Sequence, residues 1–484
     1  MIDKKRLLKI KIIRIVTAVF SLLAIAFMLN CGMRHKDFKK VQEKILHQDY
    51  VGQNLSENEE IEFNSWLDEK YPVRTQVLRN LPYNVNPFEL DVKAGSAIVV
   101  DTNNGCVLYE KNADEVIPPA SMTKLFVMYV VFKEIASGKI SLTDVVPLPP
   151  ECWACNMPPH SSLMFLGKDQ TVTVEELLTG MAVCSGNDGA YAIANYVSGG
   201  MDKFIERMNS EAALLGLKNT HFVEASGYSE LNTTTAREMA AFARTYVHEF
   251  PESVEKFHSV KEWTYPQEHN RAPADKGKKG NQDFSKGFPQ NIWMGITQKN
   301  TNPLLDKLEG CNGLKTGYID ESGYNLALTC SRKGMNVLSV TMRGPGKNAN
   351  EGNQGRVHDG TLLMEWAYGT FHEFKMPSVL RTYYIPSLYT KKNVVALVPA
   401  FKPEALNVPV ALANDKSIAA LEVSVVVHVP EVIRGGVEQG KSLGLIDYMM
   451  NGVLLESIPL VVQESVADAN PWNKAADWLS EKIF

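Results

Sequence analysis

The sequence has no marked excess of either charge. Lys and Arg total 50, Asp and Glu total 55, and the formal net charge of the 484 residues is −5. Proteins that bind nucleic acid present a concentrated basic face, and this balance gives no indication of one. With 45% hydrophobic and 22% charged residues, the composition is that of a globular chain rather than a disordered one. Its length suits two or three domains.

Signatures of a metal site are also missing. The motif H-E-x-x-H does not occur among the 10 histidines, which argues against a metallocarboxypeptidase. Two weaker H-x-x-E matches exist, His221 with Glu224 and His428 with Glu431, and we interpret both as chance spacings. We therefore expect chemistry that needs no metal and no other cofactor.

Cysteine is too scarce and too irregularly spaced for a small disulfide scaffold. Of the 7 cysteines, only Cys152 and Cys155 are close in sequence. For this pair we expect either a small-loop disulfide or two separate thiols in a loop. A metal site shared with His160 is disfavoured, because no second ligand pair has a matching spacing.

A single hydrophobic run approaches the length of a membrane span. Ile15 to Met33 contains no charged residue, and a transmembrane helix needs about 20 apolar residues. Basic residues precede the run, which places the N-terminus inside and the rest of the chain outside. Residues 1–34 are thus an uncleaved anchor, a signal cleaved after Ala24-Ile25-Ala26, or a segment lipidated at Cys31. In each case we expect a cell-membrane location, with the catalytic domain on the extracytoplasmic (periplasmic) side.

Changes in composition divide the remainder of the chain. Residues 35–87 are polar and are predicted to form a spacer or a small accessory helical region. Residues 376–466 show the pattern of short strands, which predicts a small all-β domain. Residues 467–484 place apolar side chains at helical spacing and predict an amphipathic helix. That helix either lies in the membrane interface or packs against the β domain.

Residues 88–375 combine short strands with helices. Hairpins are predicted at 97–109 and 326–342, helices at 121–135 and 175–197, and a surface loop at 266–291. Strands at both ends with helices between them indicate an α+β fold in which helices cover an antiparallel sheet.

Three short motifs follow one another in this region: Ser121-Met122-Thr123-Lys124, Ser185-Gly186-Asn187 and Lys315-Thr316-Gly317. Ser121 opens a predicted helix, and Lys124 lies three residues further on the same helix face. A serine hydroxyl becomes a good nucleophile when a base takes its proton. The Lys124 amine suits that role if partial burial and the positive charge of Lys315 lower its pKa.

The second motif lies in or beside a helix. A hydroxyl at Ser185 can relay a proton to a leaving amine, while Asn187 holds the lysine and the substrate amide. Taken alone, this motif is more often typical of ordinary helix capping.

The third motif lies at the edge of a predicted strand. Lys315 and Thr316 suit a substrate carboxylate, and Gly317 lets an extended peptide approach the backbone closely. The backbone N–H groups of Ser121 and Tyr318 would then form an oxyanion hole.

Together the motifs resemble those of the serine-type penicillin-recognising enzymes. The flanking segments 101–105, 113–124 and 313–326 resemble one branch, the low-molecular-mass penicillin-binding proteins of the D-Ala-D-Ala carboxypeptidase family. The resemblance spans about residues 88–375. It implies a penicillin-binding/β-lactamase-like catalytic domain followed by a small all-β domain. The catalytic residues it implies are Ser121, Lys124, Ser185 and Asn187, and the substrate-binding residues are Lys315, Thr316, Gly317 and Tyr318.

The resemblance implies an enzyme that removes the terminal D-alanine from peptidoglycan stem peptides through a Ser121 ester. β-Lactam antibiotics would inhibit it, and Arg356 would assist in binding. A DD-endopeptidase acting on cross-links and a catalytically weak penicillin-binding scaffold stay open as alternatives. A class A β-lactamase is disfavoured, because Tyr228 stands where the glutamate of E-x-x-L-N belongs. Tyr318 is a departure as well, since many relatives have His after the third motif.

Overall fold

The computed structural model describes residues 4–46, 52–54, 76–80, 90–374, 381–400, 406–409, 423–450 and 453–483. Its contacts divide the chain into two compact units. The α+β unit comprises Arg74–Phe374 and Asn407–Lys416. The β unit comprises Met1–Val73, Lys375–Leu406 and Ser417–Phe484.

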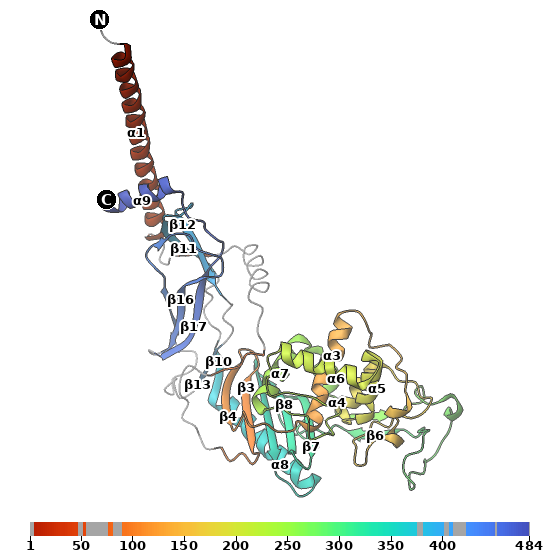
Figure 1. Cartoon of the computed structure of the whole chain (residues 1–484). Helices are drawn as coiled ribbons and strands as arrows, with labels where there is room; N and C mark the ends of the chain where they lie inside the picture. Colours follow the sequence, from red (N-terminus) through yellow and green to blue (C-terminus); the bar gives the residue numbers. More distant parts are fainter. Residues whose placement is uncertain are drawn as a thin grey trace. The chain divides into compact units, whose positions relative to one another are not determined.

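A six-stranded sheet forms the centre of the α+β unit, with the strand order β2-β4-β3-β9-β8-β7 (Figure 1). Neighbouring strands are antiparallel except for β2 and β4. The strands are β2 (Arg79–Asn80), β3 (Ser96–Asp101), β4 (Cys106–Lys111), β7 (Cys311–Ile319), β8 (Gly323–Arg332) and β9 (Met335–Gly344). Both predicted hairpins, β3–β4 and β8–β9, are confirmed, and β7 closes one end of the strand order.

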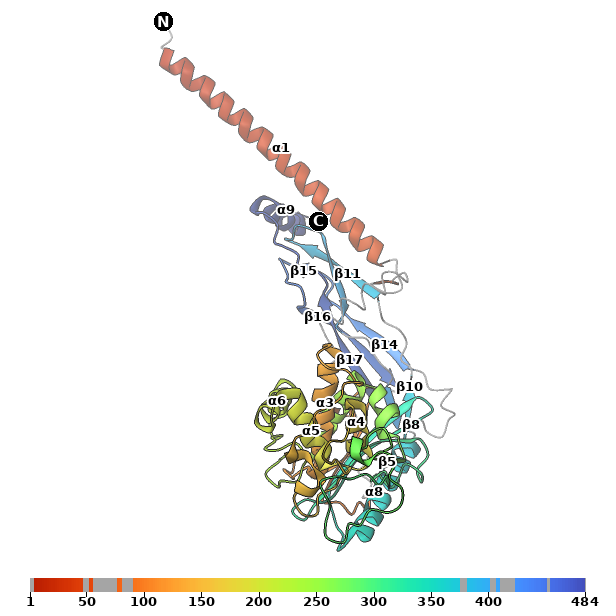
Figure 2. The same cartoon turned by 90° about the vertical axis from the view of Figure 1, so that its right-hand side faces the viewer.

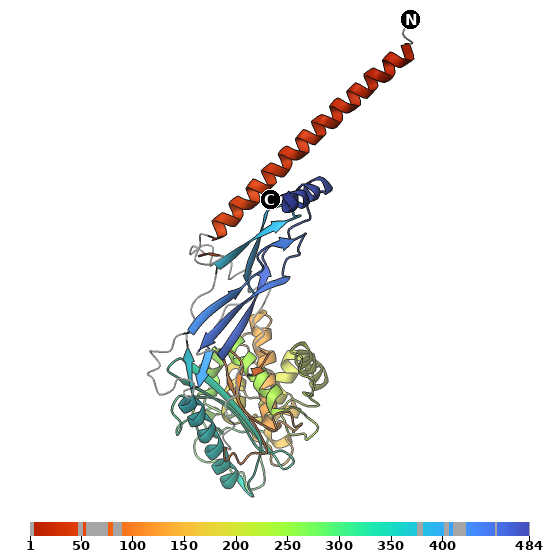
Figure 3. The ribbon, with the colours of Figure 1, turned by 90° about the vertical axis from the view of Figure 1, so that its left-hand side faces the viewer.

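The sheet is covered on both faces because its strands are apolar on both. Ile98 and Val100 belong to a core shared with the helices that follow β4. Their neighbours Ala97 and Val99 point to the opposite face and pack with helix α8. Figure 3 shows α8 on one side of the sheet and the other helices of this unit on the other side.

The helices of this unit carry most of the predicted motifs. They are η1 (Ala120–Met122), α3 (Thr123–Ala136), η2 (Pro150–Cys152), η3 (Ala154–Asn156), α4 (Val174–Val183), α5 (Asn187–Ser198), α6 (Met201–Leu214), α7 (Ala236–Glu249), the π-helical turn η4 (Val254–His258) and α8 (Ala349–Thr370). Helix α3 is buried along most of its length, and it confirms the helix predicted at 121–135.

The single helix predicted at 175–197 is wrong, because the chain forms two helices there. Helix α4 ends at Val183, and Ser185 takes a left-handed backbone with φ of 60°. The N–H groups of Cys184 and Gly186 both donate to the carbonyl of Gly180, at 3.0 and 3.2 Å, which closes the end of the helix. The break places Asn187 at the start of α5.

Two small strand pairs complete the unit. Strands β5 (Glu262–Tyr265) and β6 (Ile296–Lys299) are antiparallel neighbours. The segment 266–291, predicted as a surface loop, lies between them and contains the short turn η5 (Pro273–Asp275). The second pair is β10 (Phe371–Phe374) with β13 (Leu406–Pro409).

The β unit is built on a sheet with the order β1-β11-β12-β17-β16-β14, and β15 pairs with β11. Its strands are β1 (Gly52–Asn54), β11 (Arg381–Leu388), β12 (Val394–Pro399), β14 (Val423–His428), β15 (Ile433–Arg434), β16 (Ser442–Met450) and β17 (Val453–Val462). Tyr383, Ile446 and Ile458 are buried in its core. A separate all-β region is therefore confirmed.

Two helices from the chain termini lie side by side in the β unit (Figures 1 and 2). Helix α1 (Lys4–Leu46) is long and apolar enough to cross a membrane, and it continues past the boundary predicted at residue 34. Helix α9 (Pro471–Ile483) packs against it, with the rings of Phe27 and Trp472 4.8 Å apart. Arg34 donates to both carboxylate oxygens of Asp477, at 2.5 and 2.7 Å.

Candidate active site

Ser121 and Lys124 lie where the chain enters α3. Ser121 is the central residue of η1, and Lys124 lies in the first turn of α3. Because residues three apart share a helix face, the Nζ of Lys124 reaches the Oγ of Ser121 at 3.0 Å. The predicted contact between nucleophile and base is therefore present.

The Lys124 amine is completely buried and has three oxygen partners. Besides Ser121, its Nζ contacts the Oδ1 of Asn187 at 2.8 Å and the carbonyl oxygen of Ser226 at 2.5 Å. Burial lowers the pKa of Lys124 to about 7, against the opposing pull of the carboxylates of Glu224 and Asp188. Of the two causes predicted from the sequence, burial and the charge of Lys315, burial is thus the main one. A neutral amine here can accept the Ser121 proton and still donate two hydrogen bonds.

The second motif joins this cluster through Asn187. Asn187 is buried at the first position of α5, and its backbone N–H donates to the carbonyl of Ser162 at 2.8 Å. Ser185, two residues earlier, is buried in the left-handed break between α4 and α5. Asp188 accepts from the N–H groups of Met164, Phe165 and Leu166 at 2.8 to 3.0 Å. These bonds fasten the loop before α4 to the start of α5.

The third motif occupies the middle of β7. Lys315 is buried, and its Nζ donates to the carbonyl of Thr316 at 3.0 Å. Burial, together with the positive charges of Lys124 and Arg356, holds the pKa of Lys315 well below its usual range. The Oγ1 of Thr316 contacts the Oγ1 of Thr301 at 2.7 Å. The protonated form of the Lys315 amine is therefore disfavoured at this site unless an anion binds beside it.

Gly317 brings β7 against the nucleophile. A Cβ at this position would lie 2.6 Å from the Pro119 carbonyl oxygen and 3.1 Å from the Ser121 nitrogen. A side chain of any size would push the strand away from η1, which explains the glycine. On the other side, the Arg356 guanidinium donates to the carbonyls of Gly317 at 2.5 Å and Asn325 at 3.1 Å. Arg356 thus fixes the backbone of β7 at Gly317 through this hydrogen bond.

The side chain of Tyr318 is directed away from these groups. Its ring stacks on Tyr324 with centroids 4.3 Å apart, and its hydroxyl donates to Asp320 at 2.6 Å. The side chain is 45% exposed. Any contribution of Tyr318 to an oxyanion hole therefore comes from its backbone N–H.

The loop that contains Glu224 and Ser226 was not predicted to belong to the site. It supports Lys124 because the Ser226 carbonyl accepts from the Lys124 amine. Glu224 accepts hydrogen bonds from the N–H groups of Ser226 and Gly227, both at 2.6 Å, and from Asn232 at 3.0 Å. Gly227 has a φ of 78° and lies very close to Ala120. A Cβ on Gly227 would be only 1.9 Å from the carbonyl oxygen of Ala120. The H-x-x-E spacing of His221 and Glu224 is thus unrelated to the role of Glu224, which is to hold this loop. The only available signal was the Ser226-Gly227 turn.

His258 is a second residue that the sequence did not identify. It is buried in η4, where one ring nitrogen contacts the Tyr246 hydroxyl at 2.9 Å and the other contacts the Leu314 carbonyl at 3.1 Å. Burial lowers the pKa of His258 to about 3, so the ring stays neutral. It supports β7 directly before Lys315.

Other predicted features lie apart from this cluster. The Cys184 thiol is buried beside Ser185, and burial raises its pKa to about 12. Cys152 and Cys155 have different partners, the Pro149 carbonyl at 3.0 Å and the Asn156 side chain at 3.6 Å. These contacts favour two separate thiols over a disulfide.

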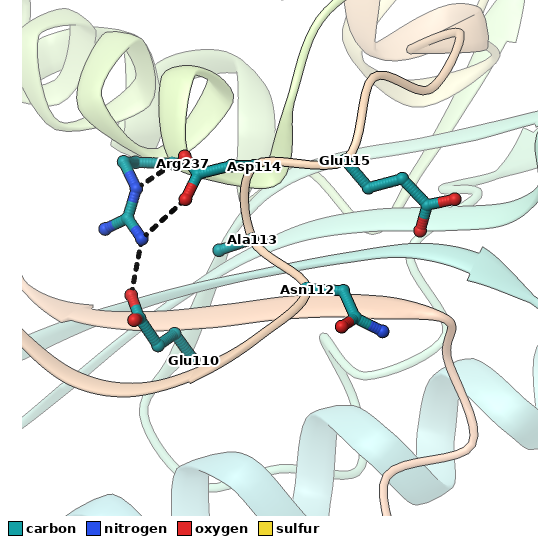
Figure 4. Close-up of a pocket in the computed structure, with 6 residues that line it drawn as sticks. All are labelled: Glu110, Asn112, Ala113, Asp114, Glu115 and Arg237. Atoms are coloured by element: carbon teal, nitrogen blue, oxygen red, sulfur yellow. Dashed lines mark hydrogen bonds and ion pairs between the residues drawn. The ribbon is translucent and has the colours of Figure 1, made fainter.

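A wide surface pocket elsewhere in the unit is a structural ion-pair cluster. It is lined by Glu110, Asp114, Glu115 and Arg237, and Arg237 bridges Glu110 and Asp114 (Figure 4). The bonds tie the end of β4 to the start of α7. Ser121 is not among its lining residues.

Comparisons with known proteins agree with this geometry. The family model described as D-alanyl-D-alanine carboxypeptidase matches residues 83–346. The chain is 30% identical over 409 residues to D-alanyl-D-alanine carboxypeptidase DacA of Haemophilus influenzae, covering 83% of this chain and 91% of that one. It is 29% identical over 392 residues to DacA of Escherichia coli, covering 80% and 87%. Penicillin binding protein 5 from Haemophilus influenzae has a similar fold, with a TM-score of 0.65, 27% identity, and coverage of 80% and 100%.

Proposed function

The chain belongs to the D-alanyl-D-alanine carboxypeptidase family, and we propose that Ser121 is the nucleophile with which it releases the terminal D-alanine of peptidoglycan stem peptides. The observation that carries this proposal is the 3.0 Å contact between Lys124 Nζ and Ser121 Oγ. Because the pKa of Lys124 is lowered to about 7, a large share of the amine is neutral near pH 7. The base and the nucleophile are thus already in contact before a substrate binds.

Acylation begins when the Ser121 oxygen bonds to the carbonyl carbon of the penultimate D-alanine. Lys124 takes the serine proton, and the carbonyl electron pair moves onto oxygen. The N–H groups of Ser121 and Tyr318 are suited to hold that oxyanion, because Gly317 keeps the two backbones in contact. The C–N bond then breaks, and the proton passes from Lys124, directly or through Ser185, to the amine of the leaving D-alanine.

Deacylation repeats the same steps with water as the nucleophile. Lys124 removes a proton from water, the hydroxyl attacks the ester carbon, and the Ser121 oxygen leaves and is reprotonated. A β-lactam enters by the same route, but its cleaved amide nitrogen remains tethered to the acyl group. The tethered leaving group hinders water, which is why we expect β-lactams to inhibit this enzyme.

A free C-terminal carboxylate fits the region around Lys315. Three basic side chains gather here, since the charges of Lys124 and Arg356 both depress the pKa of Lys315. A carboxylate bound beside Lys315 and Thr316 would supply the missing negative charge and raise the pKa of Lys315. Binding of the substrate would therefore be coupled to proton uptake.

We also propose that α1 remains attached and anchors the protein with its active site outside the cytoplasm. The basic flank precedes the apolar run, as expected for a helix whose N-terminus lies inside. The side-chain N–H of Asn30 donates to the Oδ1 of Asn473 at 3.0 Å, and the carbonyl of Cys31 accepts from Ser480 at 3.4 Å. These contacts hold the end of the apolar run on α9, and the exposed Trp472 and Trp478 of α9 suit a membrane interface.

The proposal includes the domain boundaries that were predicted from the sequence. Residues 88–375 form the catalytic domain, 376–466 the small β domain, and 467–484 the C-terminal helix. The two compact units support a division near residue 375, but they assign Asn407–Lys416 to the α+β unit. The region 35–87 acts as a spacer, and it contributes β1 to the β unit.

The full-length protein in detergent tests the function. We expect D-alanine release from a D-Ala-D-Ala pentapeptide, lost by at least about 1,000-fold in Ser121→Ala. Ser137→Ala is a matched control, because Ser137 ends α3 and donates only to the Glu134 carbonyl. Release that persists in folded Ser121→Ala protein would contradict the proposal.

A further inference from the structure

Two cysteines face each other across the strand pair that carries Lys315. Cys311 opens β7 and is the register partner of Cys330 on β8. Facing residues of an antiparallel pair have Cα atoms about 4.5–5.5 Å apart. A disulfide accepts Cα separations of about 4.4–6.8 Å. We propose that Cys311 and Cys330 are a dithiol–disulfide pair that cross-links the active-site hairpin when the protein meets an oxidising environment.

The surroundings of the two thiols give them different roles. The hydrogen bond between the thiols lowers the pKa of Cys311 and raises that of Cys330. The amide of Asn302 also donates to the Cys311 sulfur at 3.8 Å. Cys311 is half-buried, whereas Cys330 is buried. Cys311 is therefore the thiol that reacts first, and Cys330 is the thiol that resolves the intermediate.

The partial exposure of Cys311 and a cavity beside Cys330 give reagents access to this end of the hairpin. A cavity of about 620 Å³ is lined by Asn312, Thr329 and Cys330. By contrast, burial raises the pKa of both Cys152 and Cys184 to about 12, which keeps these thiols unreactive.

The oxidation is a balanced exchange with a disulfide, supplied by a thiol–disulfide oxidoreductase or by oxidised glutathione. The Cys311 thiolate attacks one sulfur of that disulfide, forms a mixed disulfide and releases the first thiol. The Cys330 thiol loses its proton and attacks the Cys311 sulfur, and the second thiol leaves. The two cysteines are oxidised by two electrons, and one disulfide is reduced to two thiols.

The cross-link would act on the strand that binds substrate. The closed loop runs from Cys311 to Cys330 and contains Lys315, Thr316 and Gly317. In the described sheet, β7 has one neighbouring strand, β8. On its other side, the start of β7 is held by hydrogen bonds from Asn302 to the Gly313 carbonyl at 2.9 Å and from the Cys311 N–H to the Leu308 carbonyl at 3.1 Å. Oxidation would fasten this end covalently, and the inference rests on the proposed extracytoplasmic location.

Redox titration of the full-length protein in detergent tests the pair. After reduction with dithiothreitol, the protein is equilibrated with oxidised glutathione, alkylated with N-ethylmaleimide and mapped by mass spectrometry. We expect a linked pair of peptides containing Cys311 and Cys330, and a Tm about 5 °C or more above that of the reduced protein. Cys330→Ser should instead retain a glutathione adduct on Cys311 and lose the redox-dependent shift of Tm.

Cys152→Ser/Cys155→Ser is the matched control and should leave the linked peptides and the Tm shift unchanged. Alkylation of both Cys311 and Cys330 in the oxidised, folded wild type would overturn the inference. A wild-type protein that keeps glutathione on Cys311 would overturn it too, because Cys330 would have failed to resolve the adduct. Neither readout uses catalysis, so failure here is distinguishable from failure of the proposed carboxypeptidase activity.

Discussion

The pH dependence of acylation follows from the burial of Lys124. The pKa of this amine is lowered from 10.5 to about 7, which corresponds to about 5 kcal/mol against the protonated form. Only the neutral amine can take the Ser121 proton. The rate of acylation should therefore rise with pH and level off above about pH 7, rather than continue to rise toward the pKa of an exposed lysine.

The expected magnitude is large enough to measure. Two pH units below the pKa, about 1% of the amine is neutral, so acylation at pH 5 should be about 100-fold slower than the plateau. Stopped-flow labelling of the full-length protein with a fluorescent penicillin gives the second-order rate constant directly. Circular dichroism at each pH separates loss of reactivity from loss of structure.

Glu224→Gln provides the decisive control. The Glu224 carboxylate raises the pKa of Lys124, so removing its charge should move the midpoint to lower pH. The amide oxygen of the variant can replace only one of the two carboxylate oxygens that accept from the Ser226 and Gly227 N–H groups, so the plateau should fall while the midpoint still moves to lower pH. A rate that is flat between pH 5 and 8, or one that continues to rise up to pH 10, would refute the assignment of Lys124 as the base.

Three further predictions concern the strand, the carboxylate and the anchor. Gly317→Ala should lower kcat/KM by about 100-fold with little effect on Tm, because the new Cβ would lie 2.6 Å from the Pro119 carbonyl oxygen. An unchanged kcat/KM would count against the close approach of β7 to the nucleophile. A pentapeptide with a C-terminal amide should react about 100-fold more slowly than the free acid, since a charge-assisted hydrogen bond near Lys315 is worth about 3 kcal/mol; equal rates would remove the carboxylate site. Asp477→Asn should lower the free energy of unfolding of the β unit by about 3 kcal/mol, because Arg34 keeps only 11% side-chain exposure. Urea titration followed by Trp fluorescence measures this loss, and Arg34→Met/Asp477→Leu should recover part of it.

The motifs that depend on local spacing were predicted well. Once a helix is predicted to begin at Ser121, Ser121 and Lys124 share one face of it. Once Lys315-Thr316-Gly317 is predicted to bind an extended peptide, its strand is expected at the edge of the sheet. The hairpin β8–β9 followed from a short turn between apolar runs. Each of these inferences needs only neighbouring residues and the periods of regular structure.

The features that the sequence did not reveal depend on contacts between distant segments. Glu224 acts through a loop that becomes significant only once Gly227 packs on Ala120. Cys311 and Cys330 become partners through the register of β7 and β8, which spacing alone does not fix. Helix α9 was expected in the membrane interface or on the β domain, and its partner α1 lies more than four hundred residues away in sequence. The break at Ser185 coincides with Ser185-Gly186-Asn187-Asp188-Gly189, which lacks any large apolar side chain, a signal that the single-helix prediction did not use.

The most direct test of the central claim is to trap the acyl-enzyme and locate it. The full-length protein would be incubated with penicillin, digested and mapped by tandem mass spectrometry. Our account predicts a penicilloyl ester on Ser121 of wild type and of Ser137→Ala, with none in Ser121→Ala. An adduct on any other residue, or no adduct in folded wild-type protein, would contradict it.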